Sequence, residues 1–226
     1  MPMMPYVSPE QAMKDKADFA RKGISRGRSV VAVTTHDGVL FVAENPSITL
    51  HKVSEIYDRI AFAAVGKYNE FEQLRVAGIR MADVKGYQYS REDVTGRSLA
   101  NAYANAMGAV FTDSMKPLEV ELLVAEVFGD SVEMYHILYD GSITDEEGFV
   151  AIGGSAEAIN AALTATYAPD MDRETAVRTC VAALREVEAR DLEPSRLEVA
   201  GLDRNLGRRK FFRLDEAEVA AILEDA

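Results

Sequence analysis

Strand-like runs in this sequence come in pairs, and a short turn joins the members of each pair. Residues 29–35 are dense in β-branched side chains, Asp37-Gly38 is a strong hairpin signal, and residues 39–43 form the returning strand. Strands grouped in this way do not fit a doubly wound parallel sheet, in which strands and helices alternate strictly. Further strand-like runs follow at 52–57, 60–65, 120–127, 131–139, 149–152, 197–202 and 209–214. The runs 52–57 and 60–65 are largely apolar, so we expect burial on both of their faces.

Helical periodicity fills the gaps between these strand pairs. Apolar side chains recur at helical spacing over 71–81 and 99–111, and again over 159–163, 176–187 and 219–223. We expect Ser155 to cap the helix over 159–163, and Asp215 and Glu218 to form a capping box for the last helix. The resulting order is helix, strands, two helices, strands, two helices, hairpin and helix. Two antiparallel sheets packed together and covered by helix pairs would satisfy this order. The pattern therefore predicts an α+β fold.

A clear helix start lies near the N-terminus. Ser8 at the N-cap, Pro9 at the first helical position and Gln11 three residues after the cap predict a capping box. We expect this helix to span residues 9–22 and to end at Gly23, since glycine commonly terminates helices.

The residues before this helix have no periodic pattern and include two prolines. We therefore expect a mobile tail over 1–8 and a single domain over 9–226. The tail has no basic cluster followed by an apolar run, so we expect no signal peptide. No stretch approaches the ~20 apolar residues of a membrane span. A single Cys fits a reducing compartment, so we expect a cytoplasmic protein that does not bind membranes.

Charge is distributed unevenly along the chain. The 25 basic and 37 acidic residues give a net charge of −12, which disfavours nucleic acid as a partner. The window 117–172 holds 12 acidic residues and no Lys or Arg, whereas basic residues dominate the first 28 positions. A solvated acidic face and a basic helix would produce this pattern. So would a subunit with oppositely charged sides that is oriented in an assembly.

No group of residues has the spacing of a metal or cofactor site. The three His residues never lie four positions apart, so structural roles are favoured and no metal is expected. Cys180 lies on the apolar stripe of a helix, which predicts a buried thiol. Gly153-Gly154-Ser155 precedes a helix but lacks the Lys of a phosphate-binding loop, so a tight turn is favoured. We expect no cofactor.

A catalytic nucleophile is also missing from the pattern. An N-terminal nucleophile needs a free Thr, Ser or Cys amine, released by cleavage before the first strand. That strand begins at Ser29, but Arg28 precedes it and the capped helix would have to be removed. Taken alone, Lys52 is interpreted as a surface lysine, and Arg208-Arg209-Lys210 as a solvated hairpin end. The residues by themselves predict no catalytic constellation.

A set of short segments, in order along nearly the whole chain, carries a resemblance to a known family. The segments are Ser8-Pro9-Glu10-Gln11, Asp18-Phe19-Ala20-Arg21, Asp37-Gly38-Val39-Leu40-Phe41-Val42-Ala43, Ala43-Glu44-Asn45-Pro46-Ser47, Lys52 with Ile56-Tyr57-Asp58-Arg59-Ile60, Ala64-Val65-Gly66-Lys67-Tyr68-Asn69-Glu70-Phe71, Tyr139-Asp140-Gly141-Ser142 and Gly153-Gly154-Ser155. In this order they resemble α-type subunits of the 20S proteasome, of the bacterial, actinobacterial kind.

The resemblance implies a fold and a role. Family members have the N-terminal-nucleophile hydrolase fold, a four-layer αββα sandwich with two five-stranded antiparallel sheets between helix layers. The α-type members keep an N-terminal helix where active β-type members expose a Thr nucleophile, which implies a non-catalytic subunit. Seven copies would form an outer ring, and two such rings would cap two rings of proteasome β subunits. Unfolded polypeptides would be the substrates of this threonine peptidase complex.

The resemblance also implies an activator-docking pocket between adjacent α subunits. Lys52 matches the lysine that pairs with the terminal carboxylate of a tail from a hexameric ATPase ring. Gly27 and Asp18 match other positions that line this pocket. A docking role therefore replaces the surface interpretation of Lys52.

The resemblance implies a gate and a channel loop as well. The N-terminal tail would lie over the axial pore, and the loop would narrow the axial channel. The gate residues are Met1, Pro2, Met3, Met4, Pro5, Tyr6, Val7, Ser8 and Pro9. The channel-loop residues are Met115, Lys116, Pro117 and Leu118.

Two other functions remain open from the sequence. One is a catalytically active β-type threonine peptidase subunit of the same fold, which would lose its N-terminal segment by processing. The other is a small-molecule enzyme that uses the acidic window as a cation site. Intact mass separates the first alternative from the gating subunit, and assembly size separates the second.

Overall fold

The strands of this protein form two five-stranded antiparallel sheets. The computed structural model describes residues 8–224. The strands are β1 Val30–Thr35, β2 Gly38–Glu44, β3 Val53–Tyr57, β4 Ile60–Gly66, β5 Val120–Phe128, β6 Ser131–Ile137, β7 Ile143–Glu146, β8 Phe149–Ile152, β9 Leu197–Asp203 and β10 Phe211–Arg213. Sheet A has the strand order β10-β9-β2-β1-β8, and sheet B has the order β3-β4-β5-β6-β7.

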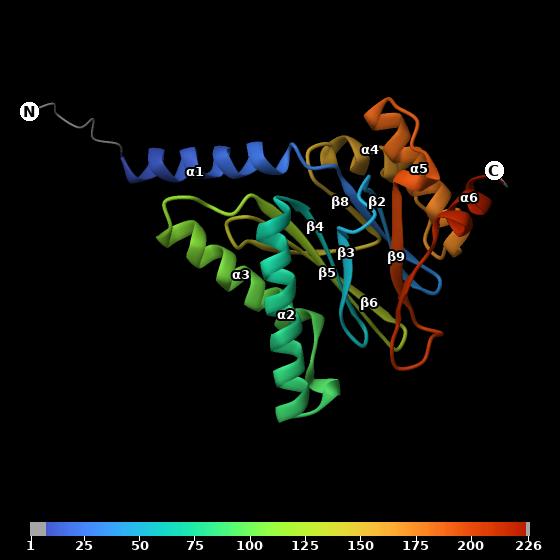
Figure 1. Ribbon diagram of the computed structural model, residues 1–226, viewed down its shortest axis with the longest axis horizontal. Helices are drawn as coiled ribbons and strands as arrows, with labels where there is room; N and C mark the ends of the chain where they lie inside the picture. Colours follow the sequence, from blue (N-terminus) through green and yellow to red (C-terminus); the bar gives the residue numbers. More distant parts are fainter. Residues whose placement is uncertain (1–7, 225–226) are drawn as a thin grey trace, which may run out of the picture.

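Helices cover the outer faces of the two sheets (Figure 1). The helices α4, α5 and α6 pack against sheet A, and the helices α2 and α3 pack against sheet B. The result is the αββα sandwich that the resemblance implies and that the order of elements allows. In the described residues the α-helices are α1 Pro9–Ile24, α2 Tyr68–Gln88, α3 Gly96–Asp113, α4 Ala156–Thr166, α5 Arg173–Glu188 and α6 Glu216–Glu224.

The central strands bury both faces because each sheet lies between a helix layer and the other sheet. In β1, Val30 and Ala32 belong to the core between the sheets, whereas Val31 and Val33 belong to the core beneath α4 and α5. This division follows from the alternation of side chains along a strand. Burial on both faces, expected for the runs 52–57 and 60–65, is confirmed for β4 but is wrong for β3, an edge strand with two partly exposed residues.

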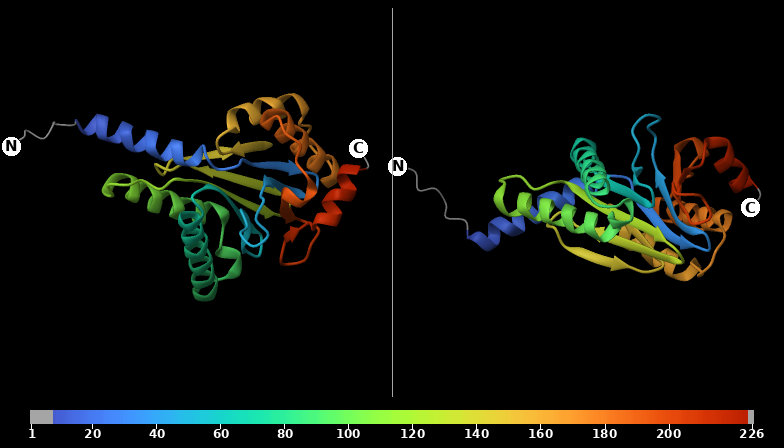
Figure 2. Two further views of the ribbon diagram at one scale, coloured as in Figure 1. Left: turned by 45° about the horizontal axis from the view of Figure 1, so that its top comes forward. Right: turned by 90° about the horizontal axis from the view of Figure 1, so that it is seen from below.

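Helix α1 lies across one end of the sandwich, and its N-terminal half projects beyond the sheets (Figures 1 and 2). Ala20 and Ile24 enter the core between the sheets. The N–H of Gln11 donates to Ser8 Oγ at 3.2 Å, which confirms the N-cap. The Gln11 side chain donates to Asp15 at 2.7 Å instead of turning back, so only half of the predicted capping box forms. The helix also continues one residue past Gly23.

Several element boundaries differ from the sequence interpretation. Strand β7 is not among the predicted strands, because its side chains are mostly polar and it is stabilised by pairing with β6 at the sheet edge. Ser155 stands at the N-cap of α4 but its side chain makes no cap hydrogen bond. The expected capping box of the terminal helix does form, between Asp215 and Glu218.

None of the helices in the described part of the chain is long and apolar enough to cross a membrane.

Candidate functional site

Lys52 ends the connection between β2 and β3, where the chain crosses from sheet A to sheet B. Its side chain is half-buried, and Nζ donates a hydrogen bond to the backbone oxygen of Arg28, in the segment between α1 and β1. One bond leaves two ammonium donors for another acceptor. The structure thus places Lys52 beside Arg28, the residue that follows Gly27. The resemblance assigned Lys52 and Gly27 to the same pocket.

Burial lowers the pKa of Lys52 from its usual value to about 8. Among the nearby charges, Glu198 raises this pKa most strongly, Arg28 lowers it, and Glu188 raises it more weakly. An ammonium that has lost much of its hydration interacts more strongly with a carboxylate than a fully solvated one does. Near neutral pH most Lys52 side chains still carry the charge that such an interaction needs.

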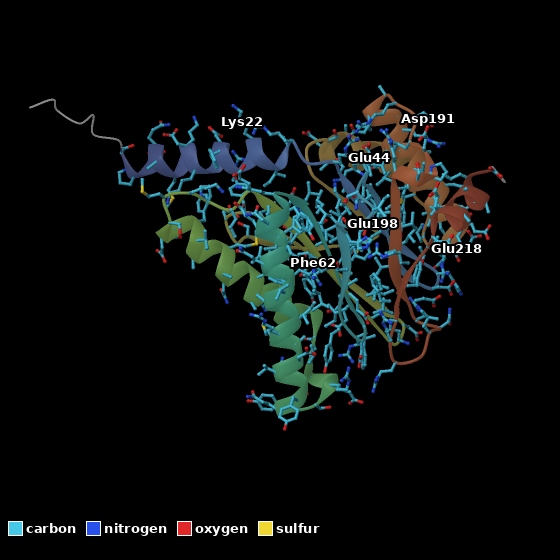
Figure 3. The ribbon with its side chains drawn as sticks, viewed as in Figure 1. Lys22, Glu44, Phe62, Asp191, Glu198 and Glu218 are labelled. Carbon is cyan, nitrogen blue, oxygen red and sulfur yellow. The ribbon has the colours of Figure 1, made fainter. Side chains whose placement is uncertain are left out.

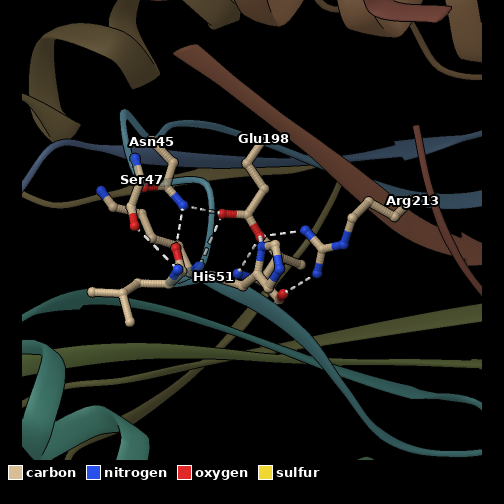
Figure 4. Close-up of polar contacts among 8 residues, drawn as sticks. Asn45, Ser47, His51, Glu198 and Arg213 are labelled. Carbon is tan, nitrogen blue, oxygen red and sulfur yellow. Dashed lines mark hydrogen bonds and ion pairs between the residues drawn. The ribbon is translucent and has the colours of Figure 1, made fainter. Parts of the chain in front are cut away.

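Glu198 is the centre of a polar network that holds the β2–β3 connection (Figure 4). Its side chain is only 6% exposed. One carboxylate oxygen accepts the amide of Asn45 at 2.7 Å and the N–H of Lys52 at 2.9 Å. The other accepts the N–H of Val53 at 3.1 Å and pairs with the guanidinium of Arg213. A buried carboxylate with this many donors is fully satisfied.

The connection itself is shaped by short-range hydrogen bonds. The Asn45 amide also donates to the backbone oxygen of Leu50 at 2.6 Å, and its side-chain oxygen accepts the N–H of Ser47 at 3.1 Å. The hydroxyl of Ser47 accepts the N–H of Leu50 at 3.1 Å. The connection contains no helix or strand, and these bonds hold it in one conformation up to Lys52.

Gly27 occupies a place where a side chain has no room. A Cβ atom at this position would lie 2.7 Å from Val65 Cγ1 and 3.0 Å from the backbone nitrogen of Gly66. Gly27 lines a groove of about 600 Å³ between the end of α1, the end of β4 and the start of β5. Lys67 and Lys116 add positive charge to this groove, and Glu119 lies there too.

Asp18 is separate from this arrangement within one chain. Its carboxylate is exposed on α1 and pairs with Arg21 at 3.3 Å, one turn along the same helix. Among the described contacts none joins Asp18 to Lys52 or Gly27. The structure therefore places Lys52 against Arg28, the residue after Gly27, although Lys52 does not line the groove beside Gly27, and it leaves Asp18 on the open side of α1.

The segment assigned as the channel loop, residues 115–118, lies next to α1. The Lys116 ammonium donates to Glu70 at 2.6 Å and pairs with Glu119 at 2.9 Å. Met115 is 98% exposed, and with Phe19 it lines an apolar groove of about 590 Å³ between α1 and the loop. Residues 1–7 of the assigned gate lie outside the described residues, whereas Ser8 and Pro9 start α1.

The other candidate residues have structural surroundings. Cys180 is buried beneath sheet A, as predicted, and burial raises the pKa of its thiol to about 12. His136 contacts Glu121 at 2.7 Å and Glu146 at 3.5 Å. Within residues 8–224 no group of three or more His, Cys, Asp or Glu side chains is arranged to hold a metal ion.

Sequence reasoning missed Glu198 and Arg213. A signal was present, because Glu198 shares one strand face with Ala200 and Leu202, both buried in the core between the sheets. A lone acidic residue on an apolar face indicates a buried and paired carboxylate. Its partners could not be read from the same signal, since Lys52 and Glu198 are 146 positions apart.

Comparison with known proteins places these features in a family. The family model described as "Proteasome subunit" matches residues 24–202. The chain is 56% identical to "Proteasome subunit alpha" of Thermobifida fusca, over 100% of this chain and 92% of that protein. It is 56% identical to the protein of the same name from Kineococcus radiotolerans, over 96% of each chain. It is 55% identical to "Proteasome subunit alpha 2" of Rhodococcus erythropolis, over 99% of this chain and 93% of that protein.

These matches span nearly the full length of the chain, and the αββα sandwich confirms the fold that the resemblance implied. The relatives are alpha subunits from actinobacteria, as the ordered segments indicated. The chain therefore belongs to the proteasome subunit family and is similar to its actinobacterial alpha subunits.

Proposed function

We propose that this chain is a non-catalytic α-type subunit of a cytoplasmic 20S proteasome, in which seven copies form the outer ring of the core particle. The observation that carries the proposal is the position of α1. This helix precedes the first strand, and its Ala20 and Ile24 lie in the core between the sheets. An N-terminal nucleophile would require a free amine near Ser29, but here Ser29 is buried and α1 precedes it in the chain.

The proposed role of the ring is to control access to proteolytic β subunits. Residues 1–9 act as the gate, and residues 115–118 narrow the channel that polypeptides enter. Two features support this assignment: α1 projects from the sandwich (Figure 2), and the exposed Met115 lines a groove beside α1. Apolar side chains in both segments can bind one another without forming a stable helix.

The ring also docks the C-terminal tails of a hexameric ATPase in pockets between adjacent subunits. Lys52 pairs with the terminal carboxylate of the tail, with Gly27 and Asp18 nearby in the assembled pocket. The half-buried ammonium of Lys52 and the close approach of backbone allowed by Gly27 support this role. Asp18, which is remote from Lys52 within one chain, would reach the pocket from the neighbouring copy.

The docking role is tested by Lys52→Ala in particles assembled with the β partner. We expect activation by the ATPase to be lost while the rings still form, because only the cation for the carboxylate is removed. Lys85→Ala is the matched control, since Lys85 is also half-buried with one side-chain partner, Ser98 at 3.2 Å. Unchanged activation of the Lys52 variant would refute the pocket.

The gate and the absence of catalysis have their own tests. Deletion of residues 1–7 should raise hydrolysis of small peptides by the assembled particle, and no rise would exclude this segment as the gate. The isolated chain should keep its full mass and show no peptidase activity. Loss of an N-terminal segment together with turnover would instead support a β-type subunit.

A further inference from the structure

A single carboxylate from the other sheet binds the backbone at Lys52, which also accepts the N–H of Ala64 in β4 at 3.1 Å. Glu198 lies on β9 of sheet A, and its register partner in β2 is Ala43, whose side chain faces the core between the sheets. Glu198 therefore points toward sheet B, where it meets the start of β3 (Figures 3 and 4). Its two oxygens accept the N–H groups of Lys52 and Val53 at 2.9 and 3.1 Å.

These two bonds fix the backbone at the residue that carries the docking cation. β3 is an edge strand, so its outer side offers no neighbouring strand to hold it in register. Arg213 completes the clamp, because its guanidinium binds both the Glu198 carboxylate and the backbone oxygen of Val53, the latter at 2.7 Å. The clamp thus joins β9 and β10 of sheet A to β3 of sheet B.

The charges around Lys52 have an ordered arrangement. Arg28 lies on one side, where its backbone oxygen accepts the Lys52 ammonium and its guanidinium pairs with the buried Glu44. Glu198 lies on the other side and is the largest negative influence on Lys52; Glu188 is a weaker one. The half-exposed His51 also faces Glu198, at 3.4 Å. Glu198 is thus the charge that most offsets the burial of Lys52.

We propose that Glu198 is the positioning residue of the docking site, which sets the backbone at Lys52 and keeps its side chain in the ammonium form that binds a free C-terminal carboxylate. This inference rests on the proposed docking function. Glu198 then has two effects, one on the backbone at Lys52 and one on the charge of its side chain, and a purely structural clamp would not combine them. A structural clamp would affect folding alone, whereas this role also sets the pH range in which docking occurs.

The first experiment measures the charge of Lys52 without any partner. In assembled particles, the rate of acetylation of Lys52 is followed by mass spectrometry from about pH 7 to pH 10, since only the neutral amine reacts. The wild-type rate should rise through a midpoint near the Lys52 pKa of about 8. In Glu198→Gln, which keeps the shape but removes the charge, the midpoint should move to lower pH.

Two further variants make the result decisive. Glu55→Gln is the matched control, because Glu55 is on β3 but within the described residues its carboxylate binds only Arg209, at 2.6 to 2.9 Å. The Lys52 midpoint should not move in this variant. Arg213→Gln leaves Glu198 without its cation, so the Lys52 midpoint should move to higher pH. Opposite shifts at Glu198 and Arg213 support the proposal. Equal shifts of the Lys52 midpoint in the two variants, or no shift in Glu198→Gln, overturn the proposal. If one variant fails to assemble, the shift in the other still decides.

The second experiment measures docking with a synthetic peptide that carries the C-terminal sequence of the partner ATPase, and with its C-terminal amide as control. At about pH 7.5 the acid form should bind Glu198→Gln particles about threefold more weakly or worse, because fewer Lys52 side chains are charged. The amide should bind all variants equally. If Lys52→Ala leaves docking intact while the acetylation midpoints shift, the proposed docking function fails, and what remains is that Glu198 sets the charge of Lys52.

Discussion

Two carboxylates in this protein bind arginines of the same β9–β10 hairpin, yet their surroundings differ. Glu198 and Arg213 have side chains that are 6% and 30% exposed, whereas Glu55 and Arg209 are 25% and 71% exposed. Glu198 also accepts three neutral donors, and Glu55 accepts none besides Arg209. The same pairing of charges is therefore a buried structural clamp at the start of β3 and a solvent-screened contact farther along that strand.

The largest expected effect comes from removing the buried carboxylate. Glu198→Ala should lower the free energy of unfolding by about 3–5 kcal/mol, because Arg213 is left as an uncompensated charge and two N–H groups lose their acceptor. Urea denaturation followed by circular dichroism measures this change. If Glu198→Ala lowers the free energy of unfolding no more than Glu55→Ala does, the buried pair and the exposed pair do not differ in their contribution to stability.

A double-mutant cycle sharpens the same comparison. The coupling free energy between Glu198 and Arg213, obtained from Glu198→Gln, Arg213→Gln and the double variant, should be about 1–3 kcal/mol. This range reflects a contact that solvent screens weakly. A coupling free energy close to zero would mean that backbone hydrogen bonds alone make Glu198 important.

A smaller effect follows from the titration of Lys52. Its pKa is lowered to about 8 in the folded protein, so between pH 8 and its usual value near 10.5 the unfolded chain binds more protons and stability rises with pH. Lys52→Met should therefore be more stable than wild type by on the order of 1 kcal/mol at about pH 7.5, and this difference should shrink toward pH 10. A difference independent of pH would contradict the lowered pKa.

The smallest effect is expected at the exposed pair. Glu55→Gln should leave the urea midpoint unchanged at physiological ionic strength, because solvent and salt screen its contact with Arg209. Any loss that does occur should disappear when salt is added. A loss that persists in high salt would show that Glu55 contributes more than a screened ion pair.

Local sequence patterns predicted much of this molecule. Runs dense in β-branched and apolar residues, with the Asp37-Gly38 turn between them, identified the first hairpin, and Ser8 and Pro9 identified the start of α1. Strand β7 was missed because its polar residues carry no apolar alternation; only pairing with β6 makes it a strand. The reciprocal half of the capping box was wrong because Gln11 has a closer partner in Asp15.

The candidate site could be predicted only in part. Lys52 and Gly27 were assigned by resemblance, and the structure places both beside Arg28. Composition and spacing alone interpreted Lys52 as a surface lysine, because nothing near it in the chain indicates burial. Neither reading identified Glu198, since its importance lies in contacts with residues more than 140 positions away.

The sequence by itself determined the strand pairs, the helices between them and the helix that precedes the first strand. These features depend on side-chain period and on caps, which act over a few residues. Only the tertiary structure decided that Glu198, Arg213 and Lys52 meet. The sandwich brings β3, an edge strand of one sheet, against the β9–β10 hairpin of the other. Burial at this contact fixes the three charged side chains and removes part of their hydration.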